Sequence, residues 1–502
     1  MIIIKLDKAQ YEYDIHSLVK AFYPEAEVRI LTPHSVIKDK KILALPHTME
    51  LTFGENGEPV TLRIAEPDGS LAAEDEEPGR REPERLYTWH PDEEEKTEYK
   101  NAFKRFLYKS LQKETGLTLP WGNLTGIRPT KIAMNMLEEG ENTAQIEAFL
   151  RTRHLVSGEK AALSIDIAQR EQRILSSLHY DDGYSLYIGI PFCPTTCLYC
   201  SFTSFPISAW KERTAAYLDA LEKEMAYVAD ACRDKILDTV YIGGGTPTSL
   251  SAEELDRLLS AVKKTFDFSA VQEFTVEAGR ADSITEEKLR VLYRHGVTRI
   301  SVNPQTMKEE TLRFIGRRHT VDQVYDAFHL AREIGFDNIN MDIILGLPGE
   351  GEDDVKATIE AIEKLSPDAL TVHSLAIKRA SRLAQWILEN GTAAFHNTDK
   401  TMKIAEEGAR RMQMLPYYLY RQKNMSGNFE NVGYAKDGKF GIYNILIMEE
   451  KQTIAAVGAG TVTKRVYGGG RIERCDTVKD VDLYIAKIDE MIDRKRNLLS
   501  SC

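Results

Sequence analysis

The chain contains the stretch Ser185-Leu-Tyr-Ile-Gly-Ile-Pro-Phe192, followed at once by Cys193-Pro-Thr-Thr-Cys197-Leu-Tyr-Cys200. The first part is apolar and has the length and composition of a buried β-strand. The second part gathers three of the six cysteines of the 502-residue chain within eight positions. Three thiols therefore lie on a loop at the carboxyl end of a predicted strand. Open α/β sheets and β/α barrels place their chemistry at this end of their strands.

Downstream of this stretch, strand-like and helix-like segments alternate. Helices of ten or more residues between strands predict βαβ units, a parallel sheet and right-handed crossovers. Six units are two short of a full barrel, so we expect an α/β fold with a partial (β/α)6 barrel, its mouth over the strand carboxyl ends. The predicted strands are Leu186–Phe192, Leu237–Ile242, Glu273–Glu277, Arg299–Asn303, Ile339–Leu345 and Ala369–Leu375, and the helices between them are 210–230, 251–265, 285–295, 320–335 and 352–365.

The residues on either side of the barrel region have other patterns. The N-terminal part begins with short strand-like runs, among them Lys41–Leu45. A charged, Pro-rich stretch at 66–85 is expected to be an exposed loop, and 92–178 has helical spacing. We expect three domains: an α+β N-terminal domain of unknown role at 1–180, the barrel at 181–376, and a small α+β C-terminal domain at 377–502 that covers the barrel mouth.

The composition argues against several classes of protein. The net charge is −12, with 77 acidic and 65 basic residues, whereas nucleic-acid binders usually have a basic excess. No apolar run approaches the roughly 18 residues of a membrane span. The start, Met1-Ile-Ile-Ile-Lys-Leu6, is too short and too soon charged for a signal peptide. The cysteines are clustered and do not form a disulfide framework, so we expect a cytoplasmic protein.

Two kinds of metal centre use clustered thiolates. A structural zinc ion takes four protein ligands and leaves no coordination position open. The nearest histidine that could be the fourth ligand, His179, lies on the far side of the strand. Three thiolates suit an iron–sulfur cluster that leaves one iron open for another ligand. An iron that is open to another ligand is a feature of catalytic clusters. From the cysteines alone, a zinc site is the rival interpretation.

Polar or glycine-rich residues stand at the ends of the later strands. The second strand runs into Gly243-Gly-Gly-Thr246, where glycines let the backbone approach a ligand closely. Glu277, Gln305 and Asp342 follow or lie in the next three strands, and Arg317 comes soon after the fourth. A structural hydrogen bond explains any one of these equally well. Their recurrence at successive strand ends predicts a ligand site.

These residues together resemble the radical S-adenosylmethionine (radical SAM) superfamily over roughly 185–376. Within it, the chain is most similar to the oxygen-independent coproporphyrinogen III oxidase family. The long N-terminal extension and Tyr420-Arg-Gln-Lys-Asn424 resemble the HemZ-type branch, coproporphyrinogen dehydrogenase. The motifs that carry the family resemblance are Leu186-Tyr-x-x-Ile-Pro-Phe-Cys193, Gly243-Gly-Gly-Thr-Pro-Thr248, Gly316-Arg-Arg-His319 and Asp342-x-x-x-Gly-Leu-Pro348.

The resemblance implies two cofactors. Cys193, Cys197 and Cys200 would hold a [4Fe–4S] cluster, and S-adenosylmethionine would chelate its fourth iron. Arg317 would pair with the methionyl carboxylate of this cofactor. The residues that match cofactor-binding positions of the family are Tyr187, Tyr199, Gly244, Gly245, Thr246, Glu277, Gln305, Arg317, Asp342 and Ala376.

The resemblance also implies a reaction in haem biosynthesis. A one-electron donor such as a flavodoxin or ferredoxin would reduce the cluster, and a 5′-deoxyadenosyl radical would start the decarboxylation of coproporphyrinogen III to protoporphyrinogen IX. The propionates of this tetrapyrrole need cationic partners, and the candidates near the mouth are Lys378, Arg379, Arg421 and Lys423.

The chain departs from the family pattern at two positions beside the cluster. Phe202 stands where the family has a fourth cysteine, and Gly189 stands where it has a histidine. The related haem-chaperone branch also has Phe at the first position, so a haem-binding chaperone is the second hypothesis. A radical SAM enzyme acting on another tetrapyrrole, or on an unrelated substrate, is the third.

Overall fold

A computed structural model describes residues 1–24, 26–35, 48–54, 58–65, 85–378, 381–390, 397–422 and 429–499. The chain folds as two compact units, Met1–Ile165 and Asp166–Cys502. The boundary between them falls within helix α7 (Gly158–Leu175). The expected division into three domains, at 180 and 376, stays a prediction.

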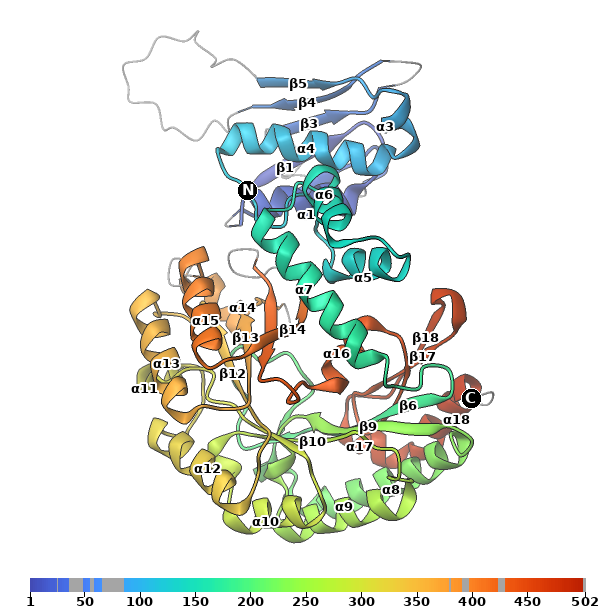
Figure 1. The fold of residues 1–502 in the computed structure, drawn as a ribbon, viewed down its shortest axis with the longest axis vertical. Coiled ribbons are helices and arrows are strands. Elements are labelled where there is room, and N and C mark those ends of the chain that lie inside the picture. The colour runs from blue at the N-terminus through green and yellow to red at the C-terminus, as the bar shows by residue number, and fades with distance from the viewer. Residues whose placement is uncertain are drawn as a thin grey trace. The chain divides into compact units, whose positions relative to one another are not determined.

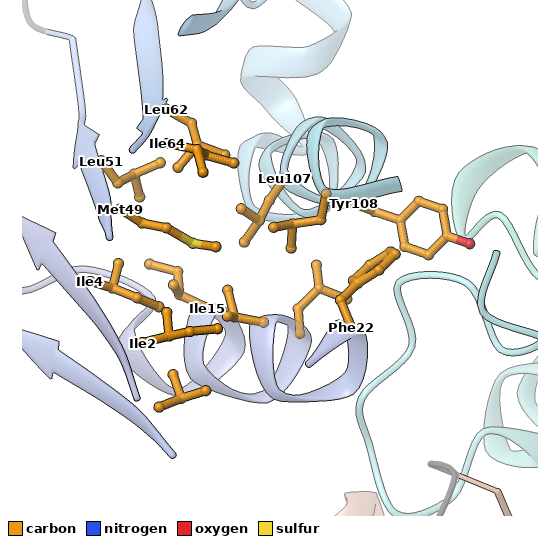
Figure 2. Packing of buried hydrophobic residues seen from close by; sticks show 14 of the residues in the cluster. Ile2, Ile4, Ile15, Phe22, Met49, Leu51, Leu62, Ile64, Leu107 and Tyr108 are labelled. Carbon is orange, nitrogen blue, oxygen red and sulfur yellow. The ribbon is translucent and has the colours of Figure 1, made fainter. Parts of the chain in front are cut away.

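The first unit is an α+β fold. Its sheet has the strand order β2-β1-β3-β4-β5, with β1 parallel to β2 and β3 and with β3, β4 and β5 antiparallel. Apolar side chains of the sheet pack against those of helices α1 and α4, and Figure 2 shows Ile4 and Leu51 facing Phe22 and Leu107. The strands are β1 (Ile2–Leu6), β2 (Val28–Leu31), β3 (Met49–Thr52), β4 (Val60–Ile64) and β5 (Arg85–Trp89), and the helices are α1 (Glu12–Phe22), α3 (Glu93–Thr97), α4 (Tyr99–Thr115), α5 (Thr130–Glu138) and α6 (Thr143–Arg153).

Two predictions for this unit concern residues that the structure does not describe. The predicted strand Lys41–Leu45 and positions 66–84 of the predicted loop lie outside the described residues. Helix α1 was not predicted, although its buried residues Ile15, Leu18, Val19 and Phe22 have helical spacing. A search by helical periodicity would have found it.

The second unit contains the partial barrel. Among the described residues, eleven strands form one sheet in the order β14-β15-β13-β12-β11-β10-β9-β6-β16-β17-β18. The predicted barrel strands are its central members, and successive barrel strands pair in parallel with one another. The α/β class and the six-unit partial barrel are therefore confirmed. The barrel strands are β6 (Gly183–Ile190), β9 (Ile236–Gly244), β10 (Glu273–Gly279), β11 (Arg299–Val302), β12 (Ile339–Leu345) and β13 (Ala369–Ser374).

Helices cover the outer side of these strands, as Figure 1 shows. Strands covered on both faces are continuously apolar, which explains the run of buried residues in β6. Helix α9 begins at a capping box in which the Ser251 hydroxyl accepts from the Glu254 N–H and the Glu254 carboxylate accepts from the Ser251 N–H. The crossover helices are α8 (Thr214–Ala231), α9 (Ala252–Thr265), α10 (Glu286–Arg294), α12 (Val321–Ile334) and α13 (Glu352–Leu365).

Residues after 376 extend the same sheet at both edges. Strand β16 (Thr453–Val457) pairs in parallel with β6, and β17 (Val462–Val466) and β18 (Ile472–Asp476) follow as antiparallel strands. At the other edge, β15 (Asn431–Ala435) runs antiparallel to β13 and β14 (Leu415–Tyr420) pairs with β15. The run Ile454–Gly460 is strand-like in sequence and contains most of β16, but its parallel pairing with β6 was not predicted. The helices outside the crossovers are α11 (Glu309–Phe314), α14 (Arg382–Asn390), α15 (Asp399–Arg411), α16 (Ile442–Glu449), α17 (Val481–Ala486) and α18 (Ile488–Leu499).

Candidate functional site

The cysteine loop follows β6 and is held at both ends. Strand β7 (Phe192–Cys193) pairs in parallel with β8 (Phe205–Pro206). Within the loop, the Leu198 N–H donates to the Ile315 carbonyl at 2.9 Å, and the Thr195 hydroxyl donates to the Gly316 carbonyl at 2.8 Å. The loop is therefore fixed at its base and tied to the segment that follows α11.

Hydrogen-bond donors surround the thiols of this loop. The Thr246 hydroxyl lies 3.4 Å from Cys193 Sγ, and an Arg280 guanidinium nitrogen lies 3.7 Å from Cys197 Sγ. Burial raises the pKa of the Cys193 thiol to about 11 and also raises that of Cys200. A bound iron would stabilise the thiolate forms that burial disfavours, and donors to sulfur tune the potential of iron–sulfur clusters. The chemistry of the donor set fits a cluster.

A preformed site for a single metal ion is a different kind of metal site from an iron–sulfur cluster. In the described part of the chain, no three Cys, His, Asp or Glu side chains are grouped so that they could hold a metal ion. The assignment of the cluster therefore rests on the donor set of the loop and on the comparisons below.

Arg280, the cation beside the loop, was not predicted. Its guanidinium donates to the Thr195 carbonyl and hydroxyl at 3.1 and 2.7 Å and to the two Asp282 oxygens at 2.9 and 2.6 Å. Burial alone would raise the pKa of Asp282, but His319 and Arg280 hold that pKa well below its ordinary value. Arg280 comes one residue after strand β10 ends, so an inspection three residues beyond Glu277 would have found it.

The barrel strands present half-buried polar side chains in otherwise mainly buried runs. They are Tyr187 in β6, Tyr241 in β9, Glu277 in β10, Asp342 in β12 and His373 in β13. The register sets Tyr187 opposite Tyr241, and paired residues of neighbouring strands point to the same face of a sheet. We call these five side chains the polar face.

Contacts join the members of the polar face around Glu277. The Tyr241 hydroxyl donates to the Glu277 carboxylate at 2.5 Å. The ring of Tyr241 stacks on those of Tyr187 and Tyr443, with centroids 6.0 and 4.5 Å apart. Burial raises the pKa of Glu277 to about 7, the hydrogen bond from Tyr241 opposes that rise, and the charge of Asp342 adds to it. Glu277 therefore changes its charge near neutral pH.

Asp342 has the opposite electrostatic behaviour. Burial alone would raise its pKa, but hydrogen bonding to His373 and Asn340 lowers it below the ordinary value. The Asn340 amide donates to Asp342 at 2.7 Å, and His373 Nε2 lies 3.9 Å from its carboxylate. The Tyr420 hydroxyl lies 3.5 Å from the other ring nitrogen of His373. Sequence reasoning missed Tyr241 and His373, which stand inside their strands, and Tyr420, which ends β14 outside the six barrel strands.

Two predicted residues have buried polar atoms without a hydrogen-bond partner among the described residues: Oε1 of Gln305 and Nε of Arg317. Gln305 has a left-handed backbone, with φ of 68°. Arg317 donates to the Asn303 carbonyl at 2.5 Å and to the Tyr199 hydroxyl at 3.3 Å. Buried polar atoms of this kind are costly unless a ligand or water satisfies them. They suit a polar cofactor.

The glycine segment after β9 lies against the cysteine loop. The N–H groups of Gly245 and Thr246 donate to the carbonyls of Ile190 and Phe192 at 2.8 and 2.7 Å. A Cβ at Gly245 would lie 2.5 Å from the Phe192 carbonyl oxygen, and Gly244 has φ of 106°. Only glycine fits at these two positions, because the segment packs closely against the backbone of the cysteine loop.

The predicted site residues thus fall into two connected groups. Tyr199, Gly244, Gly245, Thr246 and Arg317 lie around the three-cysteine loop, and Tyr187, Glu277 and Asp342 lie on the polar face. The Gln305 N–H donates to the Asp342 carbonyl at 2.9 Å, which joins Gln305 to the second group. Ala376 follows the end of β13 and is half-buried.

The positions that depart from the family pattern have distinct surroundings. Phe202 is 70% exposed, and the Lys378 ammonium lies 5.3 Å from its ring centroid. A Cβ at Gly189 would lie 2.5 Å from Thr461 Cγ2, so a larger residue there requires the Thr461 side chain to shift. Of the other predicted propionate partners, Arg421 is buried, whereas Arg379 and Lys423 lie outside the described residues.

Comparison with known proteins identifies the family to which the sequence is similar. Residues 187–362 match the family model of the radical SAM superfamily. Over 413 residues, 81% of this chain and 82% of the relative, the sequence is 42% identical to oxygen-independent coproporphyrinogen-III oxidase-like protein HemZ of Bacillus subtilis (strain 168). It is 32% identical over 305 residues to heme chaperone HemW of the same organism, covering 60% of this chain and 76% of HemW.

A solved structure agrees with the fold. Coproporphyrinogen III oxidase (HemN) from Escherichia coli, described as a radical SAM enzyme, superimposes with a TM-score of 0.50 at 21% identity. The match covers 67% of this chain and 74% of that one. Within the described residues, no helix has both the length and the apolar character needed to cross a bilayer.

Proposed function

Since this chain belongs to the oxygen-independent coproporphyrinogen III oxidase family of the radical SAM superfamily, we propose that it decarboxylates coproporphyrinogen III oxidatively to protoporphyrinogen IX without oxygen. One observation carries the proposal. The glycine segment after β9 contacts the three-cysteine loop through Thr246, and the same strand presents Tyr241 to Glu277 on the polar face. The three-cysteine loop and the polar face are therefore positioned by the same set of strands.

The cofactors of this superfamily are a [4Fe–4S] cluster and S-adenosylmethionine. When bound, they would supply a 5′-deoxyadenosyl radical that takes a hydrogen atom from a substrate propionate, and loss of CO2 and of one electron to an external electron acceptor would then leave a vinyl group. Cys193, Cys197 and Cys200 would hold the cluster. Two rounds on coproporphyrinogen III give protoporphyrinogen IX.

The polar side chains would bind and orient S-adenosylmethionine. Arg317 offers a buried cation to the methionyl carboxylate, and its unpartnered Nε supports this role. Gln305 offers a buried amide oxygen, and the ionised Asp342 accepts hydrogen bonds. The stacked Tyr187 and Tyr241 would keep water away from a reactive radical.

Three further points belong to the proposal. We expect a cytoplasmic protein, because clustered thiols for a cluster need a reducing compartment. We expect a one-electron donor such as a flavodoxin or ferredoxin. We expect no nucleic-acid partner, given the net charge of −12.

An anaerobic assay tests the proposal. Protein with a reconstituted, reduced cluster is incubated with S-adenosylmethionine and coproporphyrinogen III, and the products are identified by mass spectrometry. We expect 5′-deoxyadenosine together with tetrapyrroles that have lost the mass of one and then two formic acid equivalents. The matched control replaces Cys197 by Ser, which removes one cluster ligand. Formation of 5′-deoxyadenosine with no loss of mass from the tetrapyrrole would refute the decarboxylase proposal.

A haem-binding chaperone is the second candidate. The observation that favours it is the 32% identity to HemW over 305 residues. A chaperone of this kind binds haem in a fixed ratio and does not convert coproporphyrinogen III. Titration of the same preparation with haem, followed by its Soret absorption, separates the two candidates.

A further inference from the structure

A basic cavity of about 650 Å³ lies against the cysteine loop. Its wall includes Pro194–Thr196, which lies between the first two cysteines, and Gly316–Arg318. The other arginines that line it are Arg313 of α11 and Arg382 at the start of α14. Among its described lining residues four are arginines and none is acidic. The chain as a whole carries a net charge of −12, so this local positive charge runs against its average.

Three of the four arginines are available to a partner in solution. Arg313, Arg318 and Arg382 are exposed. The Arg313 guanidinium lies 3.8 Å from the Glu309 carboxylate, but an exposed pair one helical turn apart is weak. Arg317 is buried and forms the inner side of the cavity. The exposed arginines therefore form a rim, and Arg317 forms the floor.

The cavity is distinct from the polar face. None of the five side chains of that face lines it. Arg317 joins the cavity to the residues around the cysteine loop, since it lines the cavity and also donates to Tyr199 and Asn303. A ligand in the cavity would therefore meet the backbone of the cysteine loop and Arg317 without touching the polar face.

The chemistry needed at this loop is delivery of an electron. We infer that the arginine rim docks an acidic one-electron carrier protein of the flavodoxin or ferredoxin type, which reduces the cluster across Pro194–Thr196. One electron leaves the reduced carrier and enters the oxidised cluster, with no bond formed or broken and no proton transferred. Encounters between redox proteins use small interfaces, and complementary charge speeds them. A rim of three exposed arginines suits such a short-lived contact.

The loop is also rigid enough for this role. Thr195 is bonded to Gly316 and to Arg280, so the wall between the cavity and the thiols is fixed before a partner arrives. The inference depends on the cluster and not on the tetrapyrrole substrate proposed above. Its test contains no tetrapyrrole, so its failure is distinguishable from a failure of the proposed function.

The test compares two triple variants of the full chain with reconstituted clusters. The first is Arg313→Glu, Arg318→Glu and Arg382→Glu. The control is Arg233→Glu, Arg410→Glu and Arg496→Glu, which changes the net charge equally and breaks comparable exposed pairs with Asp230, Glu406 and Asp493. Iron content and the visible spectrum establish that both variants hold the cluster.

Stopped-flow absorption measures cluster reduction by a purified, fully reduced bacterial flavodoxin. We expect the rate constant at low salt to fall about tenfold or more in the rim variant and to rise with ionic strength, because three introduced carboxylates would repel an acidic carrier. We expect it to change by less than about twofold in the control. Reduced methyl viologen, a small cation, should reduce the rim variant no more slowly than the unaltered protein.

Three outcomes would overturn the inference. The first is reduction of the rim variant by flavodoxin at the unaltered rate. The second is an equal loss in the control, which would assign the effect to net charge. The third is an equal loss with methyl viologen, which would assign the arginines to the stability of the cluster.

Discussion

At the scale of residues, Glu277 and Asp342 illustrate how neighbours set the charge of a carboxyl group. Both are half-buried on the polar face. Burial dominates at Glu277 and raises its pKa to about 7. At Asp342 the effect of burial is outweighed by hydrogen bonds from His373 and Asn340, and the pKa falls. The pair therefore combines a carboxyl group whose pKa is lowered with one whose pKa is raised to about 7, a difference common in binding and catalytic sites.

This difference predicts the pH dependence of cofactor binding. The pKa of Glu277 is raised, so the group is protonated below about pH 7 and ionised above it. If the ionised form binds the cationic cofactor, the dissociation constant of S-adenosylmethionine should rise about tenfold between pH 8 and pH 6. Calorimetric titration of the cluster-loaded protein measures this change under anaerobic conditions.

Two variants control this measurement. Glu277→Gln should weaken binding at pH 8 and remove most of the pH dependence. Asp342→Asn should weaken binding and move the pH dependence to lower pH, because the charge of Asp342 contributes to the raised pKa of Glu277. Equal slopes in the unaltered protein and Glu277→Gln would contradict the assignment, and would attribute the slope to the amino group of the cofactor itself.

At the scale of elements, a buried polar network attaches the C-terminal helix to the barrel. Lys495 of α18 donates to the Glu224 carboxylate of α8 at 2.5 Å, and both side chains are fully buried. The other oxygen of Glu224 accepts from the Tyr484 hydroxyl and the Gly458 N–H at 2.6 and 2.7 Å. Because the segment after β16 adjoins β6, this network also supports the strand that leads into the cysteine loop.

Removing the cation from this network should destabilise the second unit. Lys495→Met leaves Glu224 buried without its cation, and breaking a buried pair on one side costs about 3–5 kcal/mol. Denaturant unfolding followed by circular dichroism measures the loss. Lys487→Met, on an exposed lysine paired with Glu490, should cost less than about 1 kcal/mol. Equal costs for the two variants would show that the buried pair contributes no more than a surface pair.

At the scale of the whole molecule, two units with separate interiors make up the chain. The core shown in Figure 2 draws all its residues from positions 2–155, inside the first unit. The three-cysteine loop, the polar face and the basic cavity all belong to the second unit. The proposed cofactor site is thus confined to one of the two units.

Scanning calorimetry should therefore resolve two unfolding transitions. A ligand raises the stability only of the unit that it binds. We expect S-adenosylmethionine to raise the midpoint of one transition of the cluster-loaded protein and to leave the other unchanged. A single transition, or an equal shift of both, would mean that the two units unfold together.

The sequence by itself determined the barrel, the position of the cysteine loop and the family. These features depend on local patterns, namely the spacing of Cys193, Cys197 and Cys200, the apolar run of β6 and the alternation of strands with helices. Patterns of this kind involve residues that are close together in the sequence, so they can be recognised without knowledge of distant contacts.

Only the tertiary structure decided which distant side chains meet. Arg280 beside Cys197, Tyr241 beside Glu277, and the arginine rim around Pro194–Thr196 join residues from separate elements. The opposite shifts of the pKa values of Glu277 and Asp342 also require it. A pKa depends on burial and on charges brought near by folding, and sequence spacing records neither of these.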